Sequence, residues 1–325
     1  MVSRAPAAAE EGTGPPDGTG RARRALRADL RAAVPDALAA LLVTASVFVF
    51  LYVRVDAGTS DTLVVMPFLA DAGTYWMYWL SQAFGWAGLL WAYLTVVLGL
   101  LVSGTRPGWL RRVSPARLER LHRTTSLSTI ALMFAHALAF AAELVRYEAE
   151  LAWGSRVWTA FVDSFVPGGY DSGTGQIAIP IGQGALYLAV PLGLLFYVRQ
   201  RIGPKLWRVL HRFVIVTYVL SVWHTLLYGT NVWYDGWPRT ALWLLQIPLA
   251  LLLLDRLMRP ARRAERLGAP GAGPRRAAGW GVRLLGRVAV AAVVVALVAV
   301  VVSGRDGGRE RPAPEPAAPA AQTDG

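Results

Sequence analysis

The sequence predicts an all-α protein: a polytopic membrane helix bundle with a six-helix core and one appended C-terminal transmembrane helix. Three observations predict this class. Of the 325 residues, 54% are hydrophobic and only 17% are charged, whereas a soluble domain has roughly 25% charged residues. Seven apolar runs each approach the ~20 residues that cross a bilayer as a helix. Lys and Arg also collect on alternate sides of these runs, as they do in membrane proteins.

The seven runs lie between residues 34 and 303. A backbone in lipid must satisfy its hydrogen bonds internally, so continuous apolar runs of this length are predicted to be helices. The fourth run contains Pro180 near its start and Pro191, where we expect a kink. The predicted spans are residues 34–53, 79–102, 124–143, 178–198, 213–229, 240–258 and 284–303.

The distribution of basic residues predicts the orientation of the chain in the cytoplasmic membrane. With the N-terminus inside, 26 of the 33 Lys and Arg residues lie on the inner side and 7 on the outer side. Cytoplasmic loops retain Lys and Arg, so this excess predicts a cytoplasmic N-terminus and an outer C-terminus. The net charge of +12 therefore does not indicate nucleic-acid binding.

Composition divides the chain into five predicted parts. The seventh run is rich in Ala and Val and has no Trp, Tyr or His, which sets it apart from the other six. Pro, Ala, Gly and Arg without apolar periodicity predict disorder at both ends. The parts are a disordered basic cytoplasmic tail (1–32), a six-helix domain (33–258), a cytoplasmic linker (259–283), a seventh helix (284–303) and a disordered extracytoplasmic tail (304–325). The aromatic-rich outer loop 144–177 is predicted to lie on the membrane surface or to cap the core.

Several kinds of chemistry are excluded by what the sequence lacks. It contains no cysteine, so disulfides, Cys-ligated zinc, iron–sulfur clusters and covalently attached haem are impossible. Neither a G-x-G-x-x-G after a strand-like run nor a P-loop occurs, so we expect no built-in flavin or NAD(P)H site.

All four histidines lie in or beside two of the predicted spans. His122 and His136 belong to the third span, and His211 and His224 to the fifth. Their spacings of 14 and 13 residues correspond to roughly 20 Å along a helix. Both spans run from inside to outside, so His122 and His211 are predicted to lie near the inner surface and His136 and His224 in the outer half. Two facing pairs suit two haems, whose iron takes two axial ligands.

Helix geometry supports this pairing only in part. Fourteen residues bring His136 to within about 40° of the direction of His122, whereas thirteen leave His224 well off the direction of His211. Other roles stay open: the histidines of a non-redox transporter would serve proton coupling, and those of a structural protein would serve helix packing. Intramembrane ionisable residues are nevertheless usually functional.

These residues resemble the ferric reductase-like transmembrane domain family, which forms the membrane haem core of NADPH oxidases, ferric reductases and the haem-binding subunit of bacterial methionine sulfoxide reductase. The resemblance rests on the two histidine pairs and on the triplets Leu121-His122-Arg123 and Leu210-His211-Arg212. It extends over roughly residues 34–258.

The resemblance implies a six-helix haem-binding core with two haem b groups as cofactors. The inner iron would be bound by His122 and His211, and the outer iron by His136 and His224. Arg123 and Arg212, with Lys205 and Arg208 nearby, are candidates to pair with the anionic haem propionates.

The implied function is a membrane oxidoreductase subunit that carries single electrons from an inner donor to an outer acceptor. Because no flavin or nicotinamide domain follows the sixth span, the donor would be a separate flavoprotein or a quinol. The acceptor would be ferric iron or an extracytoplasmic redox protein. Weaker candidates at the haem edges are Trp207 and Trp223 and, on the outer side, Arg146, Tyr228, Asn231 and Trp233.

Overall fold

A computed structural model of the chain describes residues 18–104, 108, 112–260 and 274–312. Within these ranges no residue belongs to a β-strand, and seven helical segments are long and apolar enough to span a membrane. The predicted all-α membrane bundle is therefore confirmed. The seven spans are Val34–Asp56, Trp76–Ser103, Pro115–Tyr147, Gly175–Ile202, Pro204–Tyr228, Trp237–Met258 and Ala277–Ser303.

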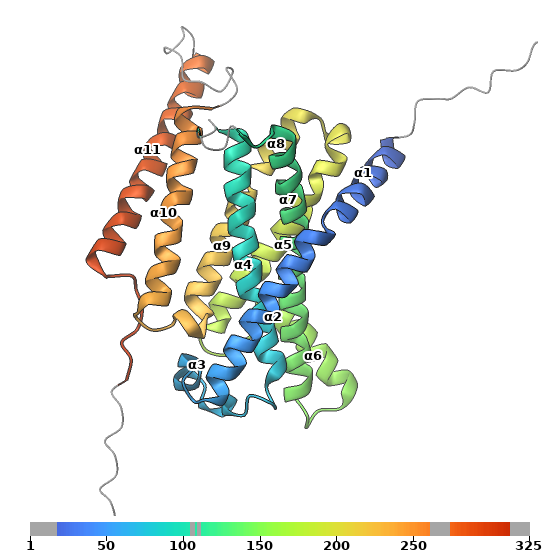
Figure 1. Ribbon diagram of the computed structural model, residues 1–325, viewed down its shortest axis with the longest axis vertical. Helices are drawn as coiled ribbons and strands as arrows, with labels where there is room; N and C mark the ends of the chain where they lie inside the picture. Colours follow the sequence, from blue (N-terminus) through green and yellow to red (C-terminus); the bar gives the residue numbers. More distant parts are fainter. Residues whose placement is uncertain (1–17, 105–107, 109–111, 261–273, 313–325) are drawn as a thin grey trace, which may run out of the picture.

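Four elements form the centre of the bundle: α4 (Trp76–Ser103), α5 (Pro115–Tyr147), α7 (Gly175–Ile202) and α9 (Val214–Tyr228) (Figure 1). Helices α4 and α5 have the most extensive contact. A Cβ on Gly88 of α4 would lie 3.6 Å from the Cβ of Leu132. Small residues at such positions allow helix backbones to approach closely in a membrane, where apolar burial gives little drive for association.

Helix α2 (Val34–Asp56) packs across the outside of α4 and α5. Asp36, near its start, accepts hydrogen bonds from Nε1 of Trp91 on α4 and from the hydroxyl of Ser128 on α5. One carboxylate thus holds three helices together. The opposite face of α2 is apolar and exposed, as expected of a surface that contacts lipid.

The last two spans, α10 (Trp237–Met258) and α11 (Pro274–Ser303), run side by side at one edge of the bundle (Figure 1). No residue in the most apolar stretch of α11 is buried. Helix α11 is therefore peripheral to the bundle, in agreement with the predicted seventh, appended helix.

The bundle has two ends, which we name after short helices. The α8 end carries α8 (Pro204–His211) and α1 (Gly18–Ala32), and the α6 end carries α6 (Trp153–Phe165) and α3 (Asp61–Val65). Two 3-10 turns, Pro67–Ala70 and Thr230–Val232, also lie between helices in the chain. Helix α6 falls within the predicted aromatic loop, and its Trp153 and Trp158 are 68% and 65% exposed.

The prediction of disorder through residue 32 is wrong for residues 18–32, which form α1. Asp29 of α1 pairs with Arg123 of α5 at 3.0 Å and accepts a hydrogen bond from the hydroxyl of Tyr197 on α7 at 3.1 Å. These contacts come from distant parts of the chain, so the local composition did not reveal them. Residues 1–17 lie outside the described residues.

The prediction of disorder after residue 303 is also wrong for residues 304–312, which we call the C-terminal strap. Asp306 of the strap is 8% exposed and pairs with the buried Arg239 at 3.3 Å. Its backbone carbonyl accepts further hydrogen bonds from Arg239 and from Trp243. A short backbone bridge joins Arg309 to Tyr234. The rest of the predicted tail, 313–325, is not described.

The predicted linker 259–283 is shorter in the structure, because α11 begins at Pro274. Residues 261–273 lie outside the described part. Arg287 of α11 donates two hydrogen bonds to the carbonyl of Leu257 at the end of α10, at 3.1 and 2.9 Å. This contact fixes the two helices against each other on either side of the connection.

Candidate functional site

The structure brings the four histidines together as two pairs. His122 and His136 lie on α5, His211 ends α8, and His224 lies on α9. The ring centroids of His122 and His211 are 5.9 Å apart, and those of His136 and His224 are 6.1 Å apart. The rings of each pair are inclined at 82° and 71° respectively. The pairing expected from the sequence is therefore the pairing that the fold produces.

A break in the helix resolves the spacing of 13 residues in the second pair. Helix α8 ends at His211 and α9 begins at Val214. Between them, the amide of Phe213 donates to the carbonyl of Leu210 at 3.0 Å, and the amide of Val216 donates to the carbonyl of Phe213 at 2.9 Å. These bonds span three residues rather than four, which tightens the turn. The two rings thus need not follow the angles of one straight helix.

Three of the rings have Nδ1 bound to a backbone carbonyl of a neighbouring helix. Nδ1 of His136 lies 2.7 Å from the Ser81 carbonyl, that of His122 3.0 Å from the Thr95 carbonyl, and that of His224 2.8 Å from the Ala178 carbonyl. A carbonyl only accepts, so each Nδ1 carries the proton and each Nε2 keeps a free lone pair. Metal-binding histidines are commonly held in this way.

His211 differs from the other three. Its buried Nδ1 has no hydrogen-bond partner among the described residues, although the Leu192 carbonyl lies nearby. The ring stacks instead on Trp207, with centroids 5.3 Å apart and planes inclined at 20°. Packing rather than a hydrogen bond therefore orients this imidazole.

Glycines make room for three of the rings. A Cβ on Gly85 would lie 3.1 Å from Nδ1 of His136, and a Cβ on Gly182 would lie 2.7 Å from Nδ1 of His224. A Cβ on Gly99 would lie 3.0 Å from Cε1 of His122. Each glycine follows its ring's carbonyl acceptor by four residues, which is about one helical turn. The missing side chain exposes that carbonyl to the ring.

This arrangement has a signal in the sequence that the spacing of the histidines does not reveal. Ser81 and Gly85 recur on α4 as Thr95 and Gly99, 14 residues later. The interval equals that between His122 and His136 on α5. Two antiparallel helices with the same repeat bring their matched positions together at two depths. On α7 the repeat is broken, because Leu192 is followed four residues later by Phe196 rather than glycine.

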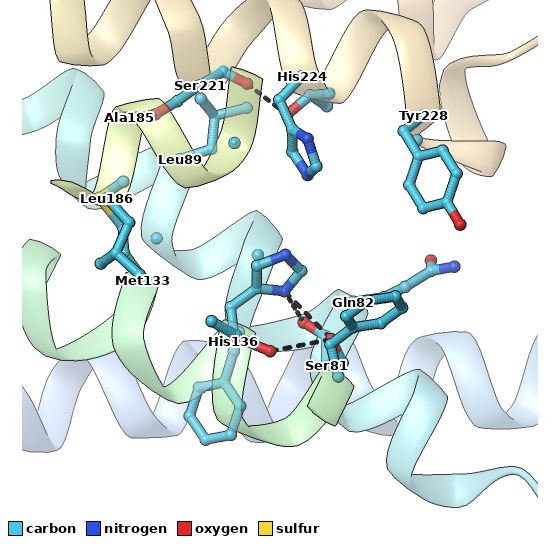
Figure 2. Close-up of a pocket in the computed structure, with 18 of the residues that line it drawn as sticks. Ser81, Gln82, Leu89, Met133, His136, Ala185, Leu186, Ser221, His224 and Tyr228 are labelled. Carbon is cyan, nitrogen blue, oxygen red and sulfur yellow. Dashed lines mark hydrogen bonds between the residues drawn. The ribbon is translucent and has the colours of Figure 1, made fainter. Parts of the chain in front are cut away.

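The predicted outer pair, His136 and His224, faces a cavity of about 160 Å³ at the α6-end half of the bundle, which we call the outer cavity. Figure 2 shows His136 and His224 pointing toward each other across it, with Ser81 bonded to His136 and Tyr228 beside His224. The Oε1 atom of Gln183 and the hydroxyl of Ser164, both buried, have no partner in the described structure. Most of the lining is apolar, as is typical of small-molecule and cofactor sites.

The predicted inner pair, His122 and His211, faces a larger cavity of about 850 Å³ at the α8 end, which we call the inner cavity. The predicted Arg123 and Arg212 both line it, as do Arg208 and Trp207, whereas Lys205 does not belong to its lining. Arg123 also pairs with Asp29 of α1. Further arginines from α10 and α11 line the cavity. They were not predicted, because the site was expected to lie within the six-helix core.

The weaker outer candidates divide between the site and the surface. Tyr228 lines the outer cavity and donates to the hydroxyl of Tyr170 at 3.1 Å. Asn231 donates to Gln82, another lining residue, at 2.7 Å. Arg146 bonds instead to the Thr74 carbonyl. Trp223 is 51% exposed, so the structure does not support its predicted packing against a cofactor.

Trp233 does not line the outer cavity either. The guanidinium of Arg309 in the C-terminal strap lies 3.6 Å from the centroid of its ring.

Comparison with known proteins agrees with this geometry. Residues 84–222 match the family model described as "Ferric reductase like transmembrane component". This segment is similar to the ferric reductase-like transmembrane family. The matched segment runs from α4 into α9 and holds three of the four histidines, while His224 lies two residues beyond it. Neither the curated proteins nor the solved structures gave a match. The match to a ferric reductase-like segment suggests a membrane oxidoreductase function, and the seven candidate spans indicate a multi-pass membrane protein.

Proposed function

We propose that the chain is the electron-transfer subunit of a membrane oxidoreductase and that it holds two b-type haems. The observation that carries the proposal is the geometry of the two histidine pairs, with ring centroids 5.9 and 6.1 Å apart. Two imidazoles on opposite sides of one metal ion, with metal–nitrogen bonds of about 2.0 Å, have ring centres roughly 6 Å apart. His122 and His211 would hold the inner haem, and His136 and His224 the outer one.

The donor set fits a haem better than a bare metal ion. No group of three or more His, Asp or Glu side chains in the described ranges could hold a metal. A bare zinc ion usually takes four ligands, of which a protein supplies at least three. Haem iron needs only two axial ligands from the protein, and imidazole is a common one. Two-histidine sites beside cavities thus favour haem.

Several residues would prepare each site for its cofactor. The carbonyls of Thr95, Ser81 and Ala178 fix the tautomer of three histidines and leave Nε2 as the ligand. Arg123 and Arg212 would pair with propionates at the inner cavity. Haem iron with two imidazole ligands supplies one-electron redox chemistry and has no open position for oxygen.

The direction of transfer follows from the charge bias of the sequence. Basic residues concentrate at the α8 end, which the positive-inside rule assigns to the cytoplasm. Electrons would therefore enter beside His122 and His211 and leave beside His136 and His224. The donor would be a separate flavoprotein or a quinol, and the acceptor ferric iron or an extracytoplasmic redox protein.

Electron transfer through the protein can be measured in sealed proteoliposomes. Reduced methyl viologen trapped inside supplies one electron at a time, and ferricyanide outside accepts one. We expect fast ferricyanide reduction with the wild-type protein and little above empty liposomes with His136→Ala or His122→Ala. Ser126→Ala, in the inner cavity but not a ligand candidate, is the matched control and should retain the rate. Equal rates in all variants would contradict the proposal.

A further inference from the structure

The inner cavity extends well beyond the histidine pair. From His122 and His211 it reaches Leu257 and Pro260 at the end of α10 and Gly286 on α11. Its volume of about 850 Å³ is near the upper end of the roughly 300–1,000 Å³ of small-molecule sites. This extension lies outside the family match, which ends at residue 222. The appended helix therefore adds a compartment to the core.

The charge of the cavity wall is strongly positive. Among the described residues that line it, Glu119 is the only carboxylate, beside six arginines. A guanidinium has five N–H donors, so an arginine that contacts a protein neighbour can still bind an anion. The six are Arg123, Arg208, Arg212, Arg256, Arg283 and Arg287.

Two of these arginines, Arg283 and Arg287, lie on the face of α11 that borders the cavity. Arg287 is held by its hydrogen bonds to the Leu257 carbonyl. Arg283 precedes it by four residues, which places both on the same face of α11. Between them, a Cβ on Gly286 would meet no atom within 4 Å, so this face borders open space. Arg256 faces the same cavity from α10.

We propose that the compartment between α8, α10 and α11 binds the phosphate group of an anionic ligand beside the inner histidine pair. Arginine forks match phosphate oxygens in geometry and charge. Basic pockets between membrane helices bind the head groups of anionic lipids. Helix α11 is otherwise unburied, which leaves the compartment close to the surrounding lipid. The phosphate can thus belong to a phospholipid or to a soluble ligand.

The test uses the full-length protein, loaded with its cofactor and reconstituted in phosphatidylcholine nanodiscs. Phosphatidylglycerol is titrated into the discs, and native mass spectrometry counts the lipids retained per chain. We expect preferential retention of phosphatidylglycerol. Loss of two arginines worth about 1 kcal/mol each corresponds to a roughly 30-fold weaker interaction, so Arg256→Gln with Arg283→Gln should abolish the preference. Arg259→Gln, at the same end but outside the cavity lining, is the control.

A competition arm separates the two sources of phosphate. If inorganic pyrophosphate displaces phosphatidylglycerol from the wild-type protein, the site accepts soluble phosphates. If lipid stays bound, the site is specific for a lipid head group; either result supports a phosphate site. Equal retention of both lipids, together with no pyrophosphate binding, overturns the proposal.

A second variant guards against misfolding of the double mutant. Gly286→Leu places a bulky side chain in the compartment without changing its charge, and it should also weaken retention of phosphatidylglycerol. Haem is counted in every sample. The phosphate site does not depend on the haem assignment. If the wild-type protein lacks haem but still retains the lipid, the proposal of a phosphate site is supported. Loss of haem in the double mutant with lipid retention unchanged would instead assign these arginines to the propionates.

Discussion

At the scale of single residues, Gly182 is a position where one methyl group should displace a histidine. Its added Cβ would lie 2.7 Å from Nδ1 of His224, whereas a Cβ on Gly184 would have Leu220 3.9 Å away as its nearest neighbour. We predict that Gly182→Ala loses about one of two haems per chain while Gly184→Ala keeps both. Alanine is favoured over glycine in a helix interior by about 1 kcal/mol, so the control should stay folded. Absorption spectra of the purified variants measure the loss.

The inner pair offers the complementary residue-scale prediction. A Cβ on Gly99 would lie 3.0 Å from the ring of His122, so Gly99→Ala should lose the inner haem and spare the outer one. The two sites can be told apart by redox titration, because removal of either haem leaves a single remaining potential. If Gly99→Ala and Gly182→Ala leave the same potential, the assignment of the glycines to separate sites is wrong.

The spacing of residues along the sequence predicted the histidine pairs, but the sequence did not predict which groups of other helices contact them. The matched intervals of the histidines predicted the two pairs that the structure brings together, because residues at equal intervals on two parallel helices lie side by side. The carbonyls of Ser81 and Thr95 could not be assigned in this way, since their role depends on how α4 lies against α5. The repeated Ser81/Gly85 and Thr95/Gly99 units identify these carbonyl acceptors only once it is known that α4 packs against α5.

At the scale of elements, the C-terminal strap should stabilise the α6 end. Removing one partner of a buried ion pair costs about 3–5 kcal/mol, and Arg239 and Asp306 have side chains only 8% and 6% exposed. We predict that Asp306→Ala lowers the thermal unfolding temperature clearly, with both haems still bound before unfolding. Differential scanning fluorimetry in detergent measures the shift.

The matched control is Arg311→Ala in the same strap. Arg311 pairs with Asp61 at the surface, with 58% of its side chain exposed, and exposed pairs contribute about 0–1 kcal/mol. We expect almost no shift. An equal shift in both variants would show that the strap is held by its backbone rather than by the buried pair.

Helices were predictable where the chain is apolar, and less predictable where a few polar contacts determine whether a segment is ordered. All seven spans follow from hydropathy. Helix α1 and the strap do not, because Asp29 and Asp306 gain their partners only in the folded bundle. The spacing of 13 residues disagreed with a single straight helix, but the sequence did not show that the helix breaks between His211 and Val214.

At the scale of the whole molecule, the orientation in the membrane is testable because the chain has no cysteine. A single cysteine in place of Gly154 at the α6 end, or of Arg201 near the α8 end, is then the only thiol. We predict that Gly154→Cys reacts with a membrane-impermeant maleimide in intact cells. Arg201→Cys should react only after permeabilisation. The reverse pattern would invert the proposed direction of electron transfer.

The architecture of the whole molecule also shows where sequence reasoning stopped. The sequence predicted the six-helix core and the appended helix as separate parts. It did not predict that arginines of α11 line the inner cavity, because the position of a residue in a peripheral helix does not show which face packs against the bundle. The same helix leads into the strap, so one appended segment touches both ends of the core.

Counting the haems per chain decides whether each histidine pair holds one haem. A pyridine haemochrome spectrum of the purified protein, with His136→Ala and His211→Ala beside it, gives the type and number of haems per chain. We expect b-type haem at about two per chain in the wild type and about one in each variant. Absence of haem from protein made in haem-supplied cells, or unchanged haem in both variants, would contradict this expectation.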